Sequence, residues 1–151
     1  MTESTQSRIV VGVDGSQGSK DALRWAAHLA PTLGATVEAV SVWQFVASFG
    51  WSRFGGLPAP HPELEKDLQA TVDEVFGPTR PVEITTRVVE GDPAGALLAV
   101  ARDAAMIVVG SRGHGQFTGL LIGAVSARVA EHATCPVLVV HGGPPEGRSA
   151  A

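Results

Sequence analysis

A glycine-rich segment that follows an apolar run constrains this chain more than any other feature. Residues 105–109 have the composition of a buried strand, and four glycines between residues 110 and 119 precede a helical pattern. Glycine lacks a Cβ, so main-chain N–H groups in such a segment can approach a ligand closely. The start of the helix adds N–H groups without intrahelical partners, which favour an anion. The segment predicts a site for a phosphate-bearing ligand; the alternative, a connection that binds nothing, needs fewer glycines.

Composition narrows the class of protein. A chain of 151 residues with 44% hydrophobic and 17% charged residues fits one globular domain. The net charge of −4 argues against nucleic acid as the main partner, because nucleic-acid binding needs a basic surface. The sequence has no run of about 18 apolar residues, so it predicts no membrane span. The polar residues 1–7 lack an apolar signal core, so we expect a flexible N-terminus and a cytoplasmic location.

Apolar runs and helical spacing alternate along the chain. Asp92 and Pro93 are typical of a helix start, and Gly34 is expected to end the first helix, whose last turn Pro31 kinks or shortens. Residues 142–151 are expected to form a disordered tail. Strands are predicted at residues 8–13, 36–42, 82–89, 105–109 and 136–140. Helices are predicted after the turn at 14–16 to about residue 33, over about 62–76, from residue 93 onward, and over about 119–133.

This alternation predicts an α/β fold, a single doubly wound parallel sheet with helices on both faces. Ligands bind such sheets outside the carboxyl ends of the strands, where the strand order reverses. The turn after the first strand and the glycine-rich segment after the fourth strand both lie at that end. Neither the P-loop pattern nor the G-x-G-x-x-G dinucleotide pattern is present, so phosphate would be bound by a different local design.

Four segments carry a resemblance to a known family. Each segment lies at the strand or helix end where the family has it. In chain order they are residues 9–16, the helix start at residues 91–93, the motif Gly110-x2-Gly113-x9-Gly123, and the strand after Cys135. Across residues 8–141 the chain resembles the ATP-binding type of the universal stress protein family. The resemblance implies a five-stranded sheet of order 3-2-1-4-5, ATP in the crevice and a homodimer.

The resemblance also implies which residues contact the nucleotide. The strand ends and the last helix contribute different parts of the site. Gly12, Val13 and Asp14 would line the adenosine side, Val42 would touch the adenine, Val109, Gly110, Arg112 and Gly113 would meet the ribose and phosphates, and Gly123, Ala124, Val125 and Ser126 would hold the phosphates from the helix.

Two of these positions leave alternatives open. The family usually has Ser or Thr where this chain has Ala124, and one neutral hydrogen bond is worth roughly 0.5–1.5 kcal/mol, so its loss weakens ATP binding without abolishing it. Asp14 is a candidate for ligand contact or for Mg²⁺, but an Asp beside a Gly is also a common turn former.

The scattered histidines and the single Cys135 predict no metal site, and we expect Cys135 to be a buried, unreactive thiol.

Two further segments point to partners. Residues 43–54 hold five aromatic residues and are interpreted as a lid over the crevice, a surface for an unknown protein partner, or simple packing. The apolar strand 136–140 is predicted at a sheet edge, where pairing with a second copy would protect it in a homodimer.

The resulting hypothesis is a cytoplasmic ATP-binding stress-response or signalling protein whose nucleotide occupancy sets conformation or partner binding. Cyclic AMP or another adenine nucleotide is an alternative ligand, since the crevice features do not fix the number of phosphates. A nucleotide-independent interaction module of the same fold is the other alternative, which Ala124 keeps open. No residue is well placed to activate water, so we expect no catalytic residues and at most slow ATP hydrolysis.

Overall fold

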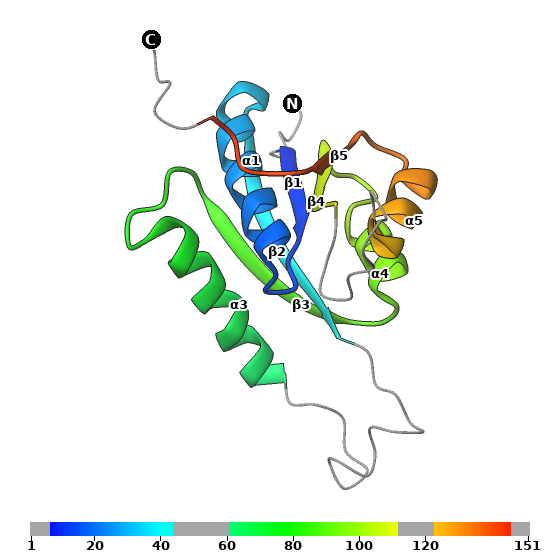
Figure 1. Ribbon diagram of the computed structural model, residues 1–151, viewed down its shortest axis with the longest axis horizontal. Coiled ribbons are helices and arrows are strands. Elements are labelled where there is room, and N and C mark those ends of the chain that lie inside the picture. The colour runs from blue at the N-terminus through cyan, green and yellow to red at the C-terminus, as the bar shows by residue number, and fades with distance from the viewer. Residues whose placement is uncertain (1–6, 44–60, 112–122, 146–151) are drawn as a thin grey trace, which may run out of the picture.

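A computed structural model of the chain describes residues 7–43, 61–111 and 123–145. Five parallel strands form one sheet in the order β3-β2-β1-β4-β5 (Figure 1). This confirms the predicted class, the parallel sheet and the strand order. The strands are β1 (Ser7–Gly12), β2 (Ala35–Trp43), β3 (Ile84–Glu90), β4 (Met106–Gly110) and β5 (Val137–Val140), and the helices are α1 (Gln17–Leu33), α3 (His61–Phe76), α4 (Pro93–Val100) and α5 (Ala124–His132).

Helices cover both faces of the sheet, and each face has its own hydrophobic core. On one face α1 and α3 pack over β1, β2 and β4 (Figure 1). On the other face α4 and α5 pack against one another and over the sheet. Neighbouring residues of β1 alternate between the two cores, because Ile9 and Val11 face α1 while Val10 faces α4. The central strand is therefore buried on both sides, as its unbroken apolar run predicts.

The helix ends follow the local sequence signals. Ser16 is the N-cap of α1 and accepts a hydrogen bond from Ser19 N, while Gly34 ends the helix at φ +62°. Asp92 is the N-cap of α4, with its carboxylate accepting from Gly95 N, as predicted. Pro31 lies inside α1, and the helix continues to Leu33 rather than ending early.

The start of α5 differs from the prediction. The apolar spacing predicted a helix from about residue 119, which put Gly123 one turn inside it. Gly123 instead is the N-cap, with φ −76° and ψ 167°, an extended conformation that cannot lie within a helix. The helix therefore begins at Ala124, and residues 119–122 lie outside the described residues. Helical spacing of apolar residues alone does not fix a helix start.

The first residues of the predicted disordered tail have a defined position. Residues 142–145 are within the described structure, and Gly142 O accepts a 2.7 Å hydrogen bond from Trp25 Nε1 on α1. A Cβ at Gly143 would come within 3.5 Å of Asp21 on the same helix. The chain after β5 therefore crosses α1 for at least these four residues.

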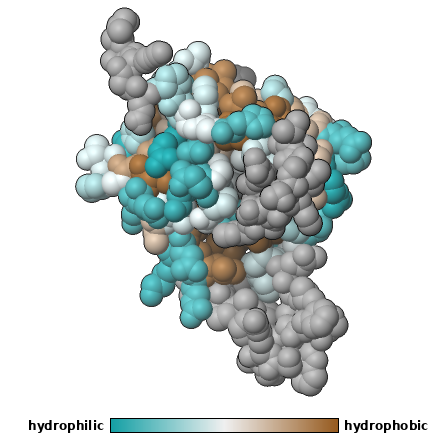
Figure 2. Space-filling view, in the orientation of Figure 1, coloured by the Kyte–Doolittle hydropathy of each residue, from teal (hydrophilic) through white to brown (hydrophobic). Residues whose placement is uncertain are grey.

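The surface seen in Figure 2 mixes hydrophilic and hydrophobic residues. Among the coloured residues the hydrophobic ones form separate patches rather than one continuous surface. Within the described residues, no helix is long and apolar enough to span a membrane.

The end of β4 lies unusually close to the first turn of α1. A Cβ placed on Gly110 would lie 2.7 Å from Gly18 C and 2.8 Å from Gly18 O, both of them backbone atoms that cannot rotate away. At Gly12 the nearest contact, at 2.9 Å, is Leu97 Cδ1, the end of a flexible side chain. At Gly142 nothing lies within 4 Å of such a Cβ. The three positions therefore provide a graded test of packing.

We expect Gly110→Ala to lower the free energy of unfolding by about 1–3 kcal/mol, the usual cost of overpacking a close contact. Gly12→Ala should cost less, because Leu97 can change rotamer, and Gly142→Ala should be nearly neutral. Urea unfolding followed by circular dichroism measures all three. Equal stability of Gly110→Ala and Gly142→Ala would show that β4 and α1 do not approach this closely.

Candidate functional site

The strand order reverses between β1 and β4, so their carboxyl ends form the switch point of the sheet. The chain leaves β1 into α1 on one face of the sheet. The segment that follows β4 leads to α5 on the other face. The helices that follow β1 and β4 therefore lie on opposite faces, and ligands bind sheets of this kind at the strand ends between such helices. This is the arrangement that the sequence predicted for its crevice.

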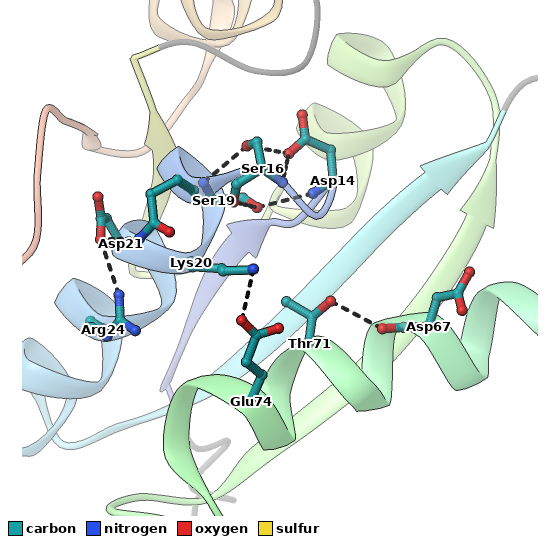
Figure 3. Close-up of polar contacts among 10 residues, drawn as sticks. Asp14, Ser16, Ser19, Lys20, Asp21, Arg24, Asp67, Thr71 and Glu74 are labelled. Carbon is teal, nitrogen blue, oxygen red and sulfur yellow. Dashed lines mark hydrogen bonds and ion pairs between the residues drawn. The ribbon is translucent and has the colours of Figure 1, made fainter.

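The turn after β1 is held by its own side chains. Asp14 Oδ1 accepts hydrogen bonds from Ser16 N at 3.0 Å and from Ser16 Oγ at 2.5 Å, and Ser19 Oγ accepts from Asp14 N at 3.3 Å (Figure 3). Gly15 within this turn has φ +84°, a conformation that suits glycine. Asp14 therefore stabilises the turn, which is one of the two roles that the sequence left open for it. The residue is exposed and lies at the carboxyl edge of the sheet.

The predicted adenosine side is largely built from buried strand ends. Val13 is buried, its N–H donates to Val40 O at 2.8 Å, and its carbonyl accepts from Ser41 Oγ at 2.8 Å. Val42 follows in β2 and is half-buried, while Val109 in β4 is buried. At Gly12, the Leu97 side chain of α4 occupies the space that a Cβ would take.

The first turn of α5 is fastened to the end of β4. Gly123 N donates to Ser111 O at 2.5 Å, and Ser126 Oγ donates to Gly110 O at 2.5 Å. Ser111 N in turn donates to Val140 O at 2.9 Å, which ties the end of β4 to the end of β5. Ser126 is buried, and its hydroxyl proton is used within the protein. These bonds fix where the start of α5 lies relative to the sheet.

The fastened helix start has main-chain N–H groups without intrahelical partners. The first intrahelical bond of α5 runs from Ala127 N to Gly123 O, so the N–H groups of residues 124–126 precede the regular pattern. Ala124 and Val125 are exposed, Val125 to 38%. Gly123 provides no side-chain cap. Such a helix start favours an anion through its N–H groups and its dipole.

Charged side chains near this edge are paired across elements. Arg128 Nη1 of α5 lies 3.3 Å from Asp92 Oδ2 at the start of α4. On the opposite face, Lys20 Nζ of α1 lies 2.9 Å from Glu74 Oε2 of α3 (Figure 3). In the described part of the chain, no group of three or more His, Cys, Asp or Glu side chains is arranged to hold a metal ion.

Two features of the described structure lie away from the strand ends. Burial raises the pKa of the Cys135 thiol, with the charge of Arg8 opposing the shift, and a weak contact joins Cys135 Sγ to Ala101 O at 3.9 Å. A raised pKa disfavours the reactive thiolate, in agreement with the unreactive thiol that the sequence predicted, although Cys135 is half-buried rather than buried. An open groove of about 590 Å³ lies between α1, Phe76, Pro81 and residues 143–145.

The structure brings most of the predicted site residues to one edge of the sheet. Those at the ends of β1, β2 and β4 and at the start of α5 gather there. Arg112, Gly113 and the aromatic residues 44–54 lie outside the described residues. The sequence did not predict the hydrogen bonds of Ser41 and Ser111, the contact of Leu97 with the end of β1, or the pairing of Asp92 with Arg128. These contacts join segments far apart in the chain, and local spacing contains no signal for them.

Comparison with known proteins gives the family. A profile of the Universal stress protein family matches residues 6–141. A universal stress protein of Mycolicibacterium smegmatis is 37% identical over 139 residues, which cover 87% of this chain and 45% of that protein. The chain thus spans about half the length of the curated relatives it matches.

Solved structures show the same fold. A universal stress protein crystallised in complex with cAMP matches with a TM-score of 0.63 and 27% identity, covering 92% of this chain and 99% of that one. The universal stress protein UspA from Lactobacillus plantarum matches with a TM-score of 0.64 and 22% identity, covering 92% of this chain and all of that one. Because the profile covers residues 6–141, nearly the whole chain, this chain belongs to the universal stress protein family.

Proposed function

We propose that this chain binds an adenine nucleotide at the carboxyl ends of β1 and β4, and that nucleotide occupancy sets its conformation or its choice of partner. ATP is the nucleotide that the sequence motif favours, with cAMP as the alternative, and Asp14 is the candidate for any Mg²⁺ that accompanies ATP. The role is binding rather than catalysis, with at most slow hydrolysis. A cytoplasmic location stays a prediction.

The start of α5 is the observation that carries this proposal. Its exposed first turn is fastened to Gly110 and Ser111 at the switch point, so main-chain N–H groups meet the place where doubly wound sheets bind ligands. The family member solved with cAMP, which is 27% identical to this chain, supports an adenine nucleotide as the ligand. The half-buried Val42 at the end of β2 offers apolar surface at the same edge of the sheet.

Val125 gives a test that separates binding from folding. We expect Val125→Glu to weaken ATP binding by about tenfold or more, because like charges 4 Å apart repel by about 1 kcal/mol even in bulk water and by more near a protein surface. An acidic residue in the first turn interacts favourably with the helix dipole, so the fold should persist. Titration calorimetry with ATP and with cAMP measures the effect.

Val125→Gln is the matched control, since it has nearly the same shape as Glu without the charge. It should bind ATP within about threefold of the original chain, a difference well under 1 kcal/mol. If the Glu and Gln variants bind equally, the phosphates do not lie at this helix start. If the unaltered chain binds neither ATP nor cAMP, the nucleotide-independent module becomes the better description.

Ala124 provides a second, constructive test. Ala124→Ser restores the hydroxyl that the family pattern usually has beside the last motif glycine. One net hydrogen bond of about 0.5–1.5 kcal/mol should tighten ATP binding by several-fold to about tenfold. Ala124→Val, which adds bulk without a hydroxyl, should bring no gain. Equal affinity of all three chains in calorimetry would place the phosphates away from residue 124.

We also propose that the chain forms a homodimer through residues 136–140. β5 is an edge strand of the sheet, as predicted, and Val137, Leu138 and Val139 are only half-buried within one copy. Pairing two such edges would satisfy their outer main-chain groups and cover the valines. Sedimentation velocity at micromolar concentration should show a dimer, whereas a monomer at every concentration would contradict this pairing.

A further inference from the structure

One ion pair links the starts of two helices that lie next to the proposed nucleotide site. Arg128 Nη1 on α5 is 3.3 Å from Asp92 Oδ2, the N-cap carboxylate of α4. The same Asp92 oxygen accepts a 2.9 Å hydrogen bond from Gly95 N. The pair therefore joins the N-cap of α4 to a side chain from the second turn of α5.

Contacts with the strand ends locate this pair. Leu97, in the second turn of α4, fills the space beside Gly12 and close to Val109. Because α4 runs antiparallel to the strands, Asp92 at its start lies further toward the carboxyl edge than Leu97 does. The first turn of α5 is bonded to Gly110 and Ser111. The Asp92–Arg128 pair thus flanks the ends of β1 and β4 on the α4 and α5 face.

Helix geometry directs Arg128 toward the proposed phosphate position. It follows Ala124 by four residues, so the two share one face of α5, and helical side chains tilt toward the N-terminus of their helix. The Arg128 and Asp92 side chains are 57% and 49% exposed, and such solvated pairs are held weakly. The guanidinium can therefore exchange the carboxylate for a phosphate oxygen without a large cost.

We propose that Arg128 is a specificity-determining residue that favours adenine nucleotides with a phosphate chain over the cyclic monophosphate, and that Asp92 restrains this preference. The proposal rests on the proposed function. ATP carries more negative charge than cAMP and reaches further along the helix start, so it gains more from a guanidinium at this position. The Asp92 carboxylate repels the more charged ligand more strongly and also holds Arg128 when no nucleotide is bound.

Two substitutions shift the preference in opposite directions. In calorimetry, Arg128→Gln should weaken ATP binding by about tenfold, the value of one charge-assisted hydrogen bond, and cAMP binding by less than about threefold. Asp92→Asn keeps a side chain that caps a helix, so the fold should persist while one negative charge is removed. It should tighten ATP binding more than cAMP binding. High salt should reduce both differences.

Arg102→Gln is the matched control. Arg102 is exposed and lies between α4 and β4, at the amino end of the sheet, so the same loss of charge there should leave the ratio of ATP to cAMP affinity unchanged. If the unaltered chain binds nucleotide but Arg128→Gln leaves the ratio of ATP to cAMP affinity unchanged, the role of Arg128 is overturned and the proposed function is not. A chain that binds neither nucleotide overturns the proposed function and this inference together.

Discussion

The close approach of Gly110 to the backbone of Gly18 is the contact on which the arrangement of the site depends. A side chain at residue 110 would meet backbone atoms under 3 Å away, so the end of β4 can reach the first turn of α1 only as glycine. The same strand end bonds the first turn of α5 through Gly110 O and Ser111 O. One short segment thus brings the starts of two helices from opposite faces of the sheet to the switch point between β1 and β4.

The described glycines have different physical roles that the sequence does not separate. Gly110 and Gly12 make room for neighbouring atoms, whereas Gly15 and Gly34 adopt positive φ in a turn and at a helix end. Gly123 has an ordinary extended conformation and ends the segment before α5. A count of glycines therefore does not tell which of them serve packing and which serve turns or helix ends.

The fold was predictable because its signals are local. Continuous apolar runs identified the buried strands, and Asp92 and Gly34 marked helix ends where the structure has them. The start of α5 was predicted too early, because apolar residues at helical spacing precede Gly123. The structure has Gly123 as the N-cap, so the helix begins only at Ala124. Contacts such as Trp25 with Gly142, or Asp92 with Arg128, depend on how distant segments pack, and no spacing in the sequence encodes them.

The polar side chains near the switch point are mostly engaged with the protein itself, and this shapes what the site can recognise. Asp14 holds Ser16, the Ser126 hydroxyl bonds Gly110 O, and Ser41 bonds Val13 O. Main-chain N–H groups at the start of α5 are then the donors best placed for an anion, and they do not depend on side-chain identity. Under the proposed function, such main-chain donors would tolerate Ala124, where the family pattern that the sequence resembles usually has a hydroxyl. Because main-chain donors bind any phosphate, the proposed discrimination between nucleotides would depend on the charged side chains of Asp92 and Arg128.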